Sequence, residues 1–474
     1  MSDKAQHDVV VVGGGLAGMI AANRAAQLGL RAIVLEQGTA EKYLCNTRYT
    51  GGTFHICLRD ITLDEDLLRQ KILESTGGFV KPELAQMMAR EGRRVIRWLQ
   101  DEGTRFMRAS ASEYHKWVLA PPGRSRPGLD WEGRGGDVLL RTLEAKLVSR
   151  KGELVRGARA KTLLIENGRC TGVLAERNGA DTAYRARAVI VADGGFQGNP
   201  ELVARYITKS PERLKQRGAG TGRGDGLTMA LAAGAALVGM NRFYGHVLSI
   251  SALTNDNLWP YPYLDSLVTA GIVVDAKGKR FVDEGRGGVY VANAIAQLED
   301  PLSAFSIFDS AIWEKAGRNG LIPTNPHLQK EGAKMYQAST LETLATESGL
   351  PGETLLRTVS DYNKALAAGA LTSVLEPPRL ASRHTPCAID QAPFYAVPMC
   401  AGITNTMGGI SINEHAQVLR ADGGGPIDDL YAVGAAAGGL EGGPELGYVG
   451  GLSKGGVTGL VAAEHIAATI AQSA

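Results

Sequence analysis

A short unit near the N-terminus limits the possible folds of this chain more than any other feature. An apolar strand over Val9–Val12 leads into the turn Gly13–Gly18, which reads Gly-Gly-Gly-Leu-Ala-Gly, and an Ala-rich helical stretch follows to about Leu28. A second apolar strand, 32–35, then ends at Glu36. Strand, Gly-x-Gly-x-x-Gly turn, helix and terminal acid together form the fingerprint of a Rossmann-type dinucleotide site. We therefore predict an α/β fold around a bound dinucleotide.

The glycines of this turn have separate physical tasks. Gly13 permits the tight turn, and Gly15 lets the backbone approach a pyrophosphate. Gly18 lets the helix pack closely on the strand. The N-terminus of the helix then faces the phosphates, and Glu36 lies at the spacing expected for an acid that binds a ribose hydroxyl.

The composition is that of a globular protein in which backbone repeatedly approaches a ligand. Of 474 residues 61 are glycine, nearly twice the usual share of about 7%, and they occur in clusters without a three-residue period. Lys and Arg number 51 against 49 Asp and Glu, a formal net charge of +2. Such a balance recruits neither nucleic acid nor an anionic membrane, so we predict no nucleic-acid partner.

The cysteines and the N-terminal residues bear on the compartment. The five cysteines form no Cys-x-x-Cys pair, which argues against a disulfide framework, an iron–sulfur cluster and a c-type haem. The chain starts with polar residues, 1–7, and no window has 18 uninterrupted apolar residues. We expect a reduced, cytoplasmic protein.

The glycine clusters divide the chain into three parts. Those of the nucleotide-binding kind lie before residue 240 and resume after 402, whereas 240–384 carries most of the aromatic and Pro-rich loops. We therefore predict a nucleotide-binding domain whose first part is 1–239 and whose C-terminal part is 385–474, with an inserted capping domain at 240–384. Apolar periodicity predicts further helices and strands: helices within 64–105, 138–147, 227–236 and 452–470, and strands at 161–165 and 188–192.

Several motifs occur in one order along the chain: Val9 to Glu36, Asn46 to Gly52, Ala192 to Phe196, Gly222 to Gly226, Gly278 to Glu284, Thr406 to Gly409 and Leu430 to Gly434. Together they resemble the succinate dehydrogenase/fumarate reductase flavoprotein family over nearly the whole chain. The tricarballylate dehydrogenase-like branch is the most similar, through Asn46 to Arg48, Arg280 to Glu284 and the glycine pair after Tyr448. The resemblance implies a Rossmann-like FAD-binding domain and an α+β capping domain inserted in it, with the substrate between the cap and the isoalloxazine.

The glycine pattern and the resemblance together predict the FAD contacts. No Ser-His-Thr block of the kind associated with covalent histidyl flavin occurs, so we predict non-covalent FAD. The predicted cofactor residues are Gly13, Gly15, Leu16, Ala17, Gly18, Glu36, Gln37, Asn46, Thr47, Thr50, Gly51, Gly52, Ala160, Ala192, Asp193, Gly194, Gly222, Asp225, Gly408, Gly434, Gly450, Gly451, Leu452 and Ser453.

The resemblance implies hydride transfer between flavin N5 and a carbon β to a carboxylate or carbonyl, with a proton exchanged at the α carbon. Fixed donors must stabilise charge that develops on the acyl oxygens. This chain departs from the family at those donors: Asn405 replaces a histidine, Tyr448 replaces an arginine, and Gly288 stands where a proton-donating arginine is expected. The Thr-Glu-x-x-Arg segment is also missing, with 263–267 in its place, which argues against a clamp for a dicarboxylate.

The remaining polar residues give the candidate catalytic set. Arg286 is the predicted proton carrier, because it lies on the loop after Glu284. His246, Asn405 and Tyr448 are predicted to polarise the acyl group, since they lie at or beside positions where the resembling family binds it. Tyr290 is a further candidate from the same loop as Arg286.

The expected function is that of an FAD-dependent oxidoreductase that forms or reduces a C=C bond next to a carboxylate or carbonyl. Two alternatives remain: a 3-ketosteroid dehydrogenase-like enzyme acting on a neutral enone, and a flavoprotein that serves mainly as an electron-transfer partner. The expected partners are a small-molecule substrate and an unidentified electron acceptor. The tricarballylate dehydrogenase-like branch implies a separate, membrane-bound redox protein.

Overall fold

The computed structural model describes residues 7–472, so the polar start at 1–6 lies outside the described part. An eight-stranded sheet forms the first layer, in the order β19-β20-β9-β10-β1-β2-β7 with β8 paired to β9. Val9 of β1 pairs in parallel with Ala188 of β10 and with Ala32 of β2, which confirms the predicted Rossmann-type strand arrangement. Its strands are β1 His7–Val12, β2 Ala32–Glu36, β7 Glu153–Arg156, β8 Ala158–Glu166, β9 Arg169–Arg177, β10 Ala180–Val191, β19 Gln417–Leu419 and β20 Pro426–Ala432.

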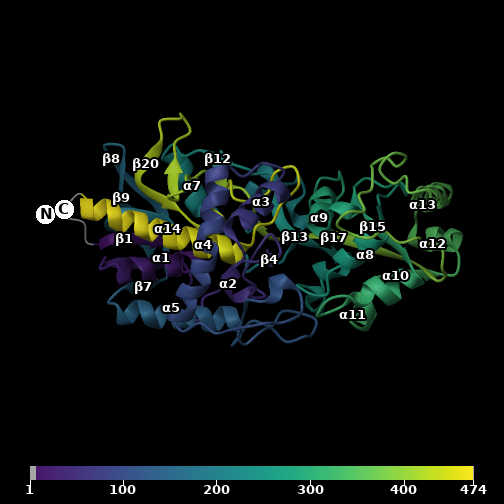
Figure 1. Ribbon diagram of the computed structural model, residues 1–474, viewed down its shortest axis with the longest axis horizontal. Coiled ribbons are helices and arrows are strands. Elements are labelled where there is room, and N and C mark those ends of the chain that lie inside the picture. Colours follow the sequence, from purple (N-terminus) through teal and green to yellow (C-terminus); the bar gives the residue numbers. More distant parts are fainter. Residues whose placement is uncertain (1–6, 473–474) are drawn as a thin grey trace.

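Helices cover this sheet because its central strands are buried on both faces. The first helix, α1, packs along the last helix, α14, so that both ends of the described chain meet at one end of the molecule (Figure 1). The predicted helices are all present, with boundaries shifted by a few residues. The helices of this part are α1 Leu16–Gln27, α2 Asn46–Tyr49, α3 Glu65–Ser75, α4 Pro82–Asp101, α5 Gly135–Ser149, α6 Pro200–Tyr206, α7 Asp225–Ala232 and α14 Gly451–Gln472.

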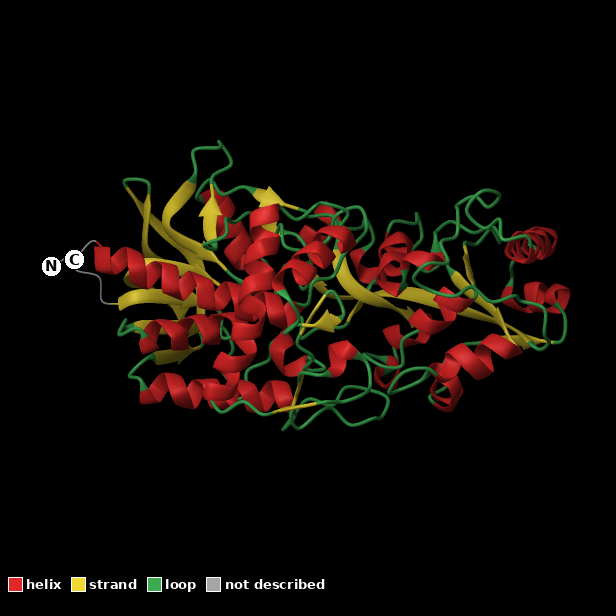
Figure 2. Ribbon diagram, in the orientation of Figure 1, coloured by secondary structure: helices red, strands yellow, loops and turns green. Residues whose placement is uncertain are grey.

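A second sheet of six strands lies beside the first part. Its order is β11-β17-β15-β14, and β13 and β16 also pair with β17. The long strand β17 runs from the middle of the elongated molecule toward the end opposite the termini (Figure 2). The strands are β11 Lys215–Gln216, β13 Phe243–Ser249, β14 Ile272–Val274, β15 Phe305–Asp309, β16 Tyr336–Ala338 and β17 Phe394–Thr406.

Among the described residues, six α-helices belong to the part that holds the second sheet, and the fold also has three small two-stranded antiparallel pairs. The helices are α8 Asp265–Ala270, α9 Gly288–Ala296, α10 Ser310–Lys315, α11 Thr324–Lys330, α12 Leu341–Ser348 and α13 Gly352–Ala367. The small pairs are β3 His55–Ile56 with β4 Arg59–Asp60, β5 Phe106–Met107 with β6 Val118–Leu119, and β12 Leu237–Val238 with β18 Gly409–Ile410. Within 7–472 no helix is long and apolar enough to cross a membrane.

Two separate apolar cores underlie the two sheets. The first gathers β1, β2, β10 and the helices α1, α4 and α14. The second gathers the strands and helices of the capping part, but it also includes residues between 196 and 227 and strand β17 as far as Ile403. The predicted limits at 240 and 384 stay predictions, although the second sheet takes β11 and β17 from outside them.

Candidate active site

A cavity of about 1780 Å³ lies between the two parts and is lined by residues from both. All five predicted catalytic residues line it: His246, Arg286, Tyr290, Asn405 and Tyr448. The predicted FAD residues line it too, except for four. One continuous space therefore joins the predicted cofactor cradle to the predicted catalytic groups.

The four exceptions are packing residues. A Cβ at Gly18 would collide with the carbonyl oxygen of Gly13, and a Cβ at Gly408 would collide with the backbone of Gly239. Gly450 lies against the carbonyl of His55 in the same way, and the Ser453 hydroxyl donates to that carbonyl at 2.6 Å. These residues hold the backbone close to the cavity without lining it.

The turn between β1 and α1 has the shape that a pyrophosphate cradle needs. Gly13 has a φ of +105°, and a Cβ there would lie 2.6 Å from the carbonyl oxygen of Ala192. Gly15 precedes the first residue of α1, and it has no side chain to cap the helix. Apart from the Leu16 N–H, which donates to the Thr47 hydroxyl, the positive end of the helix dipole therefore faces the cavity through backbone, as anion binding requires.

Glu36 lies at the end of β2, in contact with this turn. Its two carboxylate oxygens accept hydrogen bonds from the backbone N–H groups of Gly14 and Gly38, at 2.9 and 2.7 Å. Burial raises the pKa of the Glu36 carboxyl, and the two backbone hydrogen bonds oppose that shift. Each carboxylate oxygen keeps a second lone pair, so the group can accept from ribose hydroxyls that reach it.

Asp193 gives an independent indication of a polar ligand in the cradle. Its Oδ2 accepts from the Gly226 N–H at 2.7 Å, while its buried Oδ1 has no hydrogen-bond partner among the described residues. Burial raises the pKa of Asp193 to about 7. A buried oxygen without a partner at the end of β10 fits a site completed by the hydroxyl or amide groups of FAD.

The segment after β2 is tied to both parts of the protein. Thr47 accepts the N–H of Leu16 at 3.0 Å, and Asn46 donates to the carbonyl of Thr404 at 2.8 Å. Beneath them the side chains of Arg48 and Asp137 form an ion pair that is fully buried. The predicted cofactor residues of this segment are thus fixed in place by buried polar contacts.

A chain of three side chains lies at the other end of the cavity. The hydroxyl of Tyr244 lies 3.0 Å from Nε2 of His246, and Nδ1 of His246 lies 2.6 Å from Oδ2 of Asp265. Burial lowers the pKa of His246, and Arg217 lowers it further, although Asp265 opposes both. Of these three residues only His246 was predicted from the sequence.

Aromatic rings enclose this chain. Tyr448 stacks on Tyr244 with ring centroids 3.7 Å apart, and Tyr263 stacks on His246 at 4.3 Å. The Tyr448 hydroxyl accepts the N–H of Gly451 at 2.8 Å. Burial raises the pKa of both tyrosines of the first pair, so their hydroxyls are neutral at physiological pH.

Arg286 reaches the cavity but is already paired. It donates to the hydroxyl of Tyr290 at 2.7 Å and forms an ion pair with Glu445. Burial alone would lower the pKa of Arg286, but the Tyr290 hydrogen bond and the Glu445 charge raise it. A raised pKa makes release of a guanidinium proton less favourable, which weighs against the predicted role of Arg286 as proton carrier.

Two further polar residues lie near the catalytic candidates. Arg217, which was not predicted from the sequence, donates to the Thr404 hydroxyl at 2.7 Å and to the Pro260 carbonyl at 3.1 Å. Asn405 pairs with Tyr244 across β17 and β13, and its amide donates to the carbonyl of Thr406 at 3.3 Å. The amide oxygen and the free donor of Asn405 can serve a neutral carbonyl or hydroxyl group.

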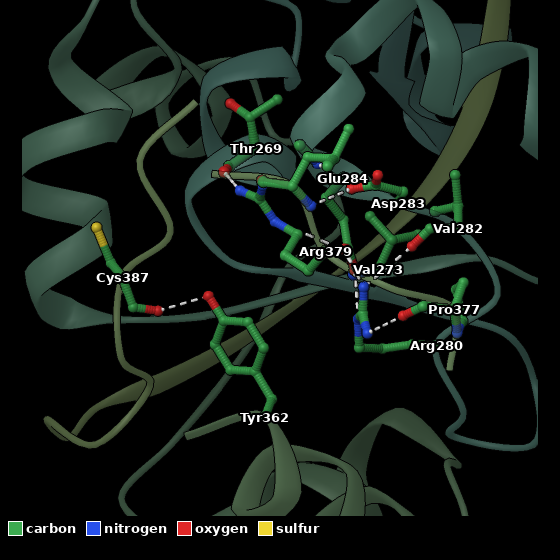
Figure 3. A network of polar contacts seen from close by, with 12 residues as sticks. Thr269, Val273, Arg280, Val282, Asp283, Glu284, Tyr362, Pro377, Arg379 and Cys387 are labelled. Carbon is green, nitrogen blue, oxygen red and sulfur yellow. Dashed lines mark hydrogen bonds and ion pairs between the residues drawn. The ribbon is translucent and has the colours of Figure 1, made fainter. Parts of the chain in front are cut away.

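A buried ionic network holds the loop that carries Arg286 (Figure 3). The carboxylate of Glu284, 0% exposed, accepts from Arg280 at 2.6 and 3.0 Å and lies 3.7 Å from Nε of Arg379. Arg379 is also fully buried and donates to the carbonyl of Thr269. One carboxylate therefore balances two guanidinium groups inside the capping part.

Comparison with known proteins agrees with this site. The FAD binding domain family matches residues 8–449. The vinyl phenol reductase of Lactiplantibacillus plantarum is 27% identical, over 92% of this chain and 91% of its own. The fumarate reductase (cytochrome) of Shewanella frigidimarina is 28% identical, over 93% of this chain and 73% of its own. Among solved structures, the 3-ketosteroid Δ1-dehydrogenase of Sterolibacterium denitrificans has a TM-score of 0.74 at 20% identity, covering 98% of this chain and 99% of its own.

Fold and site together are those of a flavoprotein in which the predicted cofactor residues and the predicted catalytic residues line one cavity. The chain belongs to the FAD binding domain family, among the flavoproteins of the succinate dehydrogenase/fumarate reductase group. It is an FAD-dependent oxidoreductase of the class that acts on CH–CH groups. The similarity to the tricarballylate dehydrogenase-like branch stays a prediction.

Replacing Glu36 with glutamine should weaken FAD binding by about 1–3 kcal/mol, because the amide loses a charged acceptor and turns an NH₂ group toward a backbone N–H. The measurement is FAD titration of the deflavinated protein, with the cofactor released by heat identified as intact FAD. Glu41→Gln, an exposed change five residues away, is the matched control. Equal affinities of the two variants would show that Glu36 does not bind the ribose.

Proposed function

We propose that this enzyme moves a hydride between FAD and a C=C bond conjugated to an uncharged carbonyl or phenol group. The observation that carries the proposal is the charge balance at the reacting end of the cavity. Arg286 is paired with Glu445, Arg217 is hydrogen-bonded within the protein, and Asp265 adds a carboxylate. A dicarboxylate would meet one arginine that is already paired with a carboxylate, and the Asp265 carboxylate would repel it.

The shape and chemistry of the walls support the same substrate class. Tyr244, Tyr261, Tyr263 and Tyr448 line the cavity together with His246. Flat aromatic faces with hydroxyl edges suit a flat conjugated ring, since they combine apolar contact with a few hydrogen bonds that fix its orientation.

The relatives give support from a different direction. The vinyl phenol reductase, which this chain matches over nearly its whole length, is named for a neutral phenol substrate. The fumarate reductases among the relatives are named for a dicarboxylate, so fumarate is the substrate against which the proposal must be tested. The neutral enone, which the sequence left as an alternative, becomes the favoured substrate type.

Each group of the site has a task in such a reaction. Bound FAD supplies the acceptor or donor of the hydride. The backbone of the β1–α1 turn and Glu36 hold the cofactor, and the neutral donors Asn405 and Tyr448 are placed to stabilise charge that develops on the substrate oxygen. Electrons reach or leave the flavin through a redox partner that we propose to be a separate molecule.

A comparison of substrates tests the proposal. With reduced viologen as electron donor, kcat/KM for cyclohex-2-enone or 4-vinylphenol should exceed that for fumarate by about 100-fold or more, the factor expected from about 3 kcal/mol of charge repulsion. Glu445→Gln, which frees Arg286 from its carboxylate, should lower KM for fumarate. Preference for fumarate by the unaltered protein would overturn the proposal.

A further inference from the structure

We infer that the hydroxyl of Tyr244 exchanges the proton at the α carbon of the substrate, with His246 and Asp265 acting through it. The inference rests on the proposed function. Tyr244, His246 and Asp265 form one unbroken chain of short hydrogen bonds, 3.0 and 2.6 Å long, and all three line the cavity.

The direction of the chain follows from its last member. Oδ1 of Asp265 accepts the backbone N–H of Val247 at 3.1 Å, and Oδ2 accepts from Nδ1 of His246. A histidine that donates through Nδ1 carries its lone pair on Nε2. Nε2 therefore accepts a hydrogen bond from the Tyr244 hydroxyl. Tyr244 supplies the reactive hydroxyl, His246 is its base, and Asp265 orients His246.

The position of Asp265 is fixed by the start of α9. A Cβ at Gly288 would collide with the Asp265 carboxyl group, so only glycine at 288 leaves room for it. The N-terminal end of α9 lies against this carboxylate, an arrangement in which the helix dipole attracts the negative charge. The family resemblance implies an arginine at position 288. In this chain the Asp265 carboxylate, which orients His246, occupies the space beside that position.

The Tyr244 hydroxyl is also held in place by its neighbours. The ring of Tyr448 is stacked on that of Tyr244, with only 10° between the planes, and Tyr263 covers one face of His246. Because packing already fixes the side chains of this base and its partners, they lose little conformational entropy when the substrate binds.

Dehydrogenation of a saturated ketone uses the three residues as a proton relay. The Cα–H bond breaks, and its proton passes to the oxygen of Tyr244 while the hydroxyl proton of Tyr244 passes to Nε2 of His246. The electron pair of the Cα–H bond becomes the new C=C bond, and the β hydrogen leaves with its electron pair as hydride to FAD. The imidazolium of His246 is then paired with Asp265, and reduction runs through the same groups in reverse.

The relay has a direction-dependent pH profile. The charged and titratable groups around His246 are Asp265, Arg217, Tyr244 and Tyr263. Because the pKa of His246 is lowered, the ring is neutral at pH 7 and ready to accept a proton. Dehydrogenation needs the neutral ring, so its rate should rise as pH increases through this pKa. Reduction needs the imidazolium, and its rate should fall over the same range.

Turnover of three variants tests the relay. Tyr244→Phe keeps the stacked ring and removes only the hydroxyl, so enone reduction should fall by about 100-fold or more with FAD content unchanged. Tyr395→Phe, a buried tyrosine of the second core outside the cavity, is the matched control and should retain its rate. Arg286→Lys should cost far less than Tyr244→Phe. A larger loss of turnover in Arg286→Lys than in Tyr244→Phe would indicate that Arg286 transfers the proton, and it would overturn the inference.

Asp265→Asn tests the orientation of His246 without reference to any substrate. The backbone N–H of Val247 fixes the amide oxygen, so the NH₂ group faces Nδ1 and forces the proton of His246 onto Nε2. NMR of ¹⁵N-labelled histidine, assigned with His246→Gln, should show Nδ1–H in the unaltered protein at pH 8 and Nε2–H in the variant. Nε2–H in the unaltered protein would overturn the relay.

The two proposals fail in different ways. If the unaltered enzyme reduces enones and Tyr244→Phe does so equally well, the relay is wrong and the substrate class stands. If the enzyme instead prefers fumarate, the substrate class is wrong, and a loss of fumarate turnover in Tyr244→Phe would still support the relay.

Discussion

Glu284→Gln is expected to lower the free energy of unfolding by about 3–5 kcal/mol, because it leaves two buried guanidinium groups without their shared carboxylate. Glu284 is 0% exposed and is held between Arg280 and Arg379. Both guanidinium groups belong to buried side chains, so water is a poor substitute for the carboxylate. Urea denaturation followed by circular dichroism gives the difference in stability.

Arg379→Met provides the internal comparison. It removes one cation and leaves Glu284 paired with Arg280 through two hydrogen bonds. The carbonyls of Thr269 and Leu380 then lack this donor, but both are neutral groups, so the loss should be smaller, about 1–3 kcal/mol. A larger loss for Arg379→Met than for Glu284→Gln would show that the network is not organised around the carboxylate. Glu353→Gln at the start of α13 controls for the amide change itself.

Gly13→Ala is expected to weaken FAD binding by about 100-fold, equivalent to roughly 2.7 kcal/mol. The added Cβ would lie 2.6 Å from the carbonyl oxygen of Ala192, at a φ of +105° that side chains rarely adopt. The turn must open to relieve both problems, and its N–H groups then leave the positions that face the pyrophosphate. Fluorescence titration of the deflavinated protein with FAD measures the change.

Gly29→Ala separates the two causes. Gly29 also has a positive φ, +83°, but a Cβ there would meet nothing within 4 Å. The variant should therefore lose some stability from backbone strain and keep its FAD affinity. If Gly13→Ala binds FAD as tightly as Gly29→Ala does, the β1–α1 turn is not the pyrophosphate cradle.

The cofactor cradle was predictable from the sequence because its parts are close together along the chain. Strand β1, the glycine turn and Glu36 lie within 30 residues, and their local geometry follows from strand, turn and helix propensities. Some predicted glycines, such as Gly408, do not line the cavity. They allow a close approach of backbone as well, but the neighbour is another segment of the protein and not the cofactor. A glycine pattern alone does not show whether the glycine packs against a cofactor or against another protein segment.

The catalytic end was predictable only in part, because its groups meet through tertiary structure. Tyr244 and His246 are two residues apart on β13, so the alternation of a strand could have placed both on one face. Asp265 comes from α8, and no local pattern links it to that strand. The pairing of Arg286 with Glu445, which decides the charge of the site, joins segments 159 residues apart.

Single-turnover reoxidation of the reduced enzyme separates a neutral enone from a dicarboxylate as substrate. The flavin of the purified protein is reduced with dithionite under anaerobic conditions and mixed with cyclohex-2-enone, and the return of the oxidised flavin spectrum is followed while the product is identified by gas chromatography. We predict stoichiometric reoxidation with formation of cyclohexanone, and much slower reoxidation by fumarate at the same concentration. Reoxidation by fumarate alone, or none by either compound, would contradict the proposed reaction.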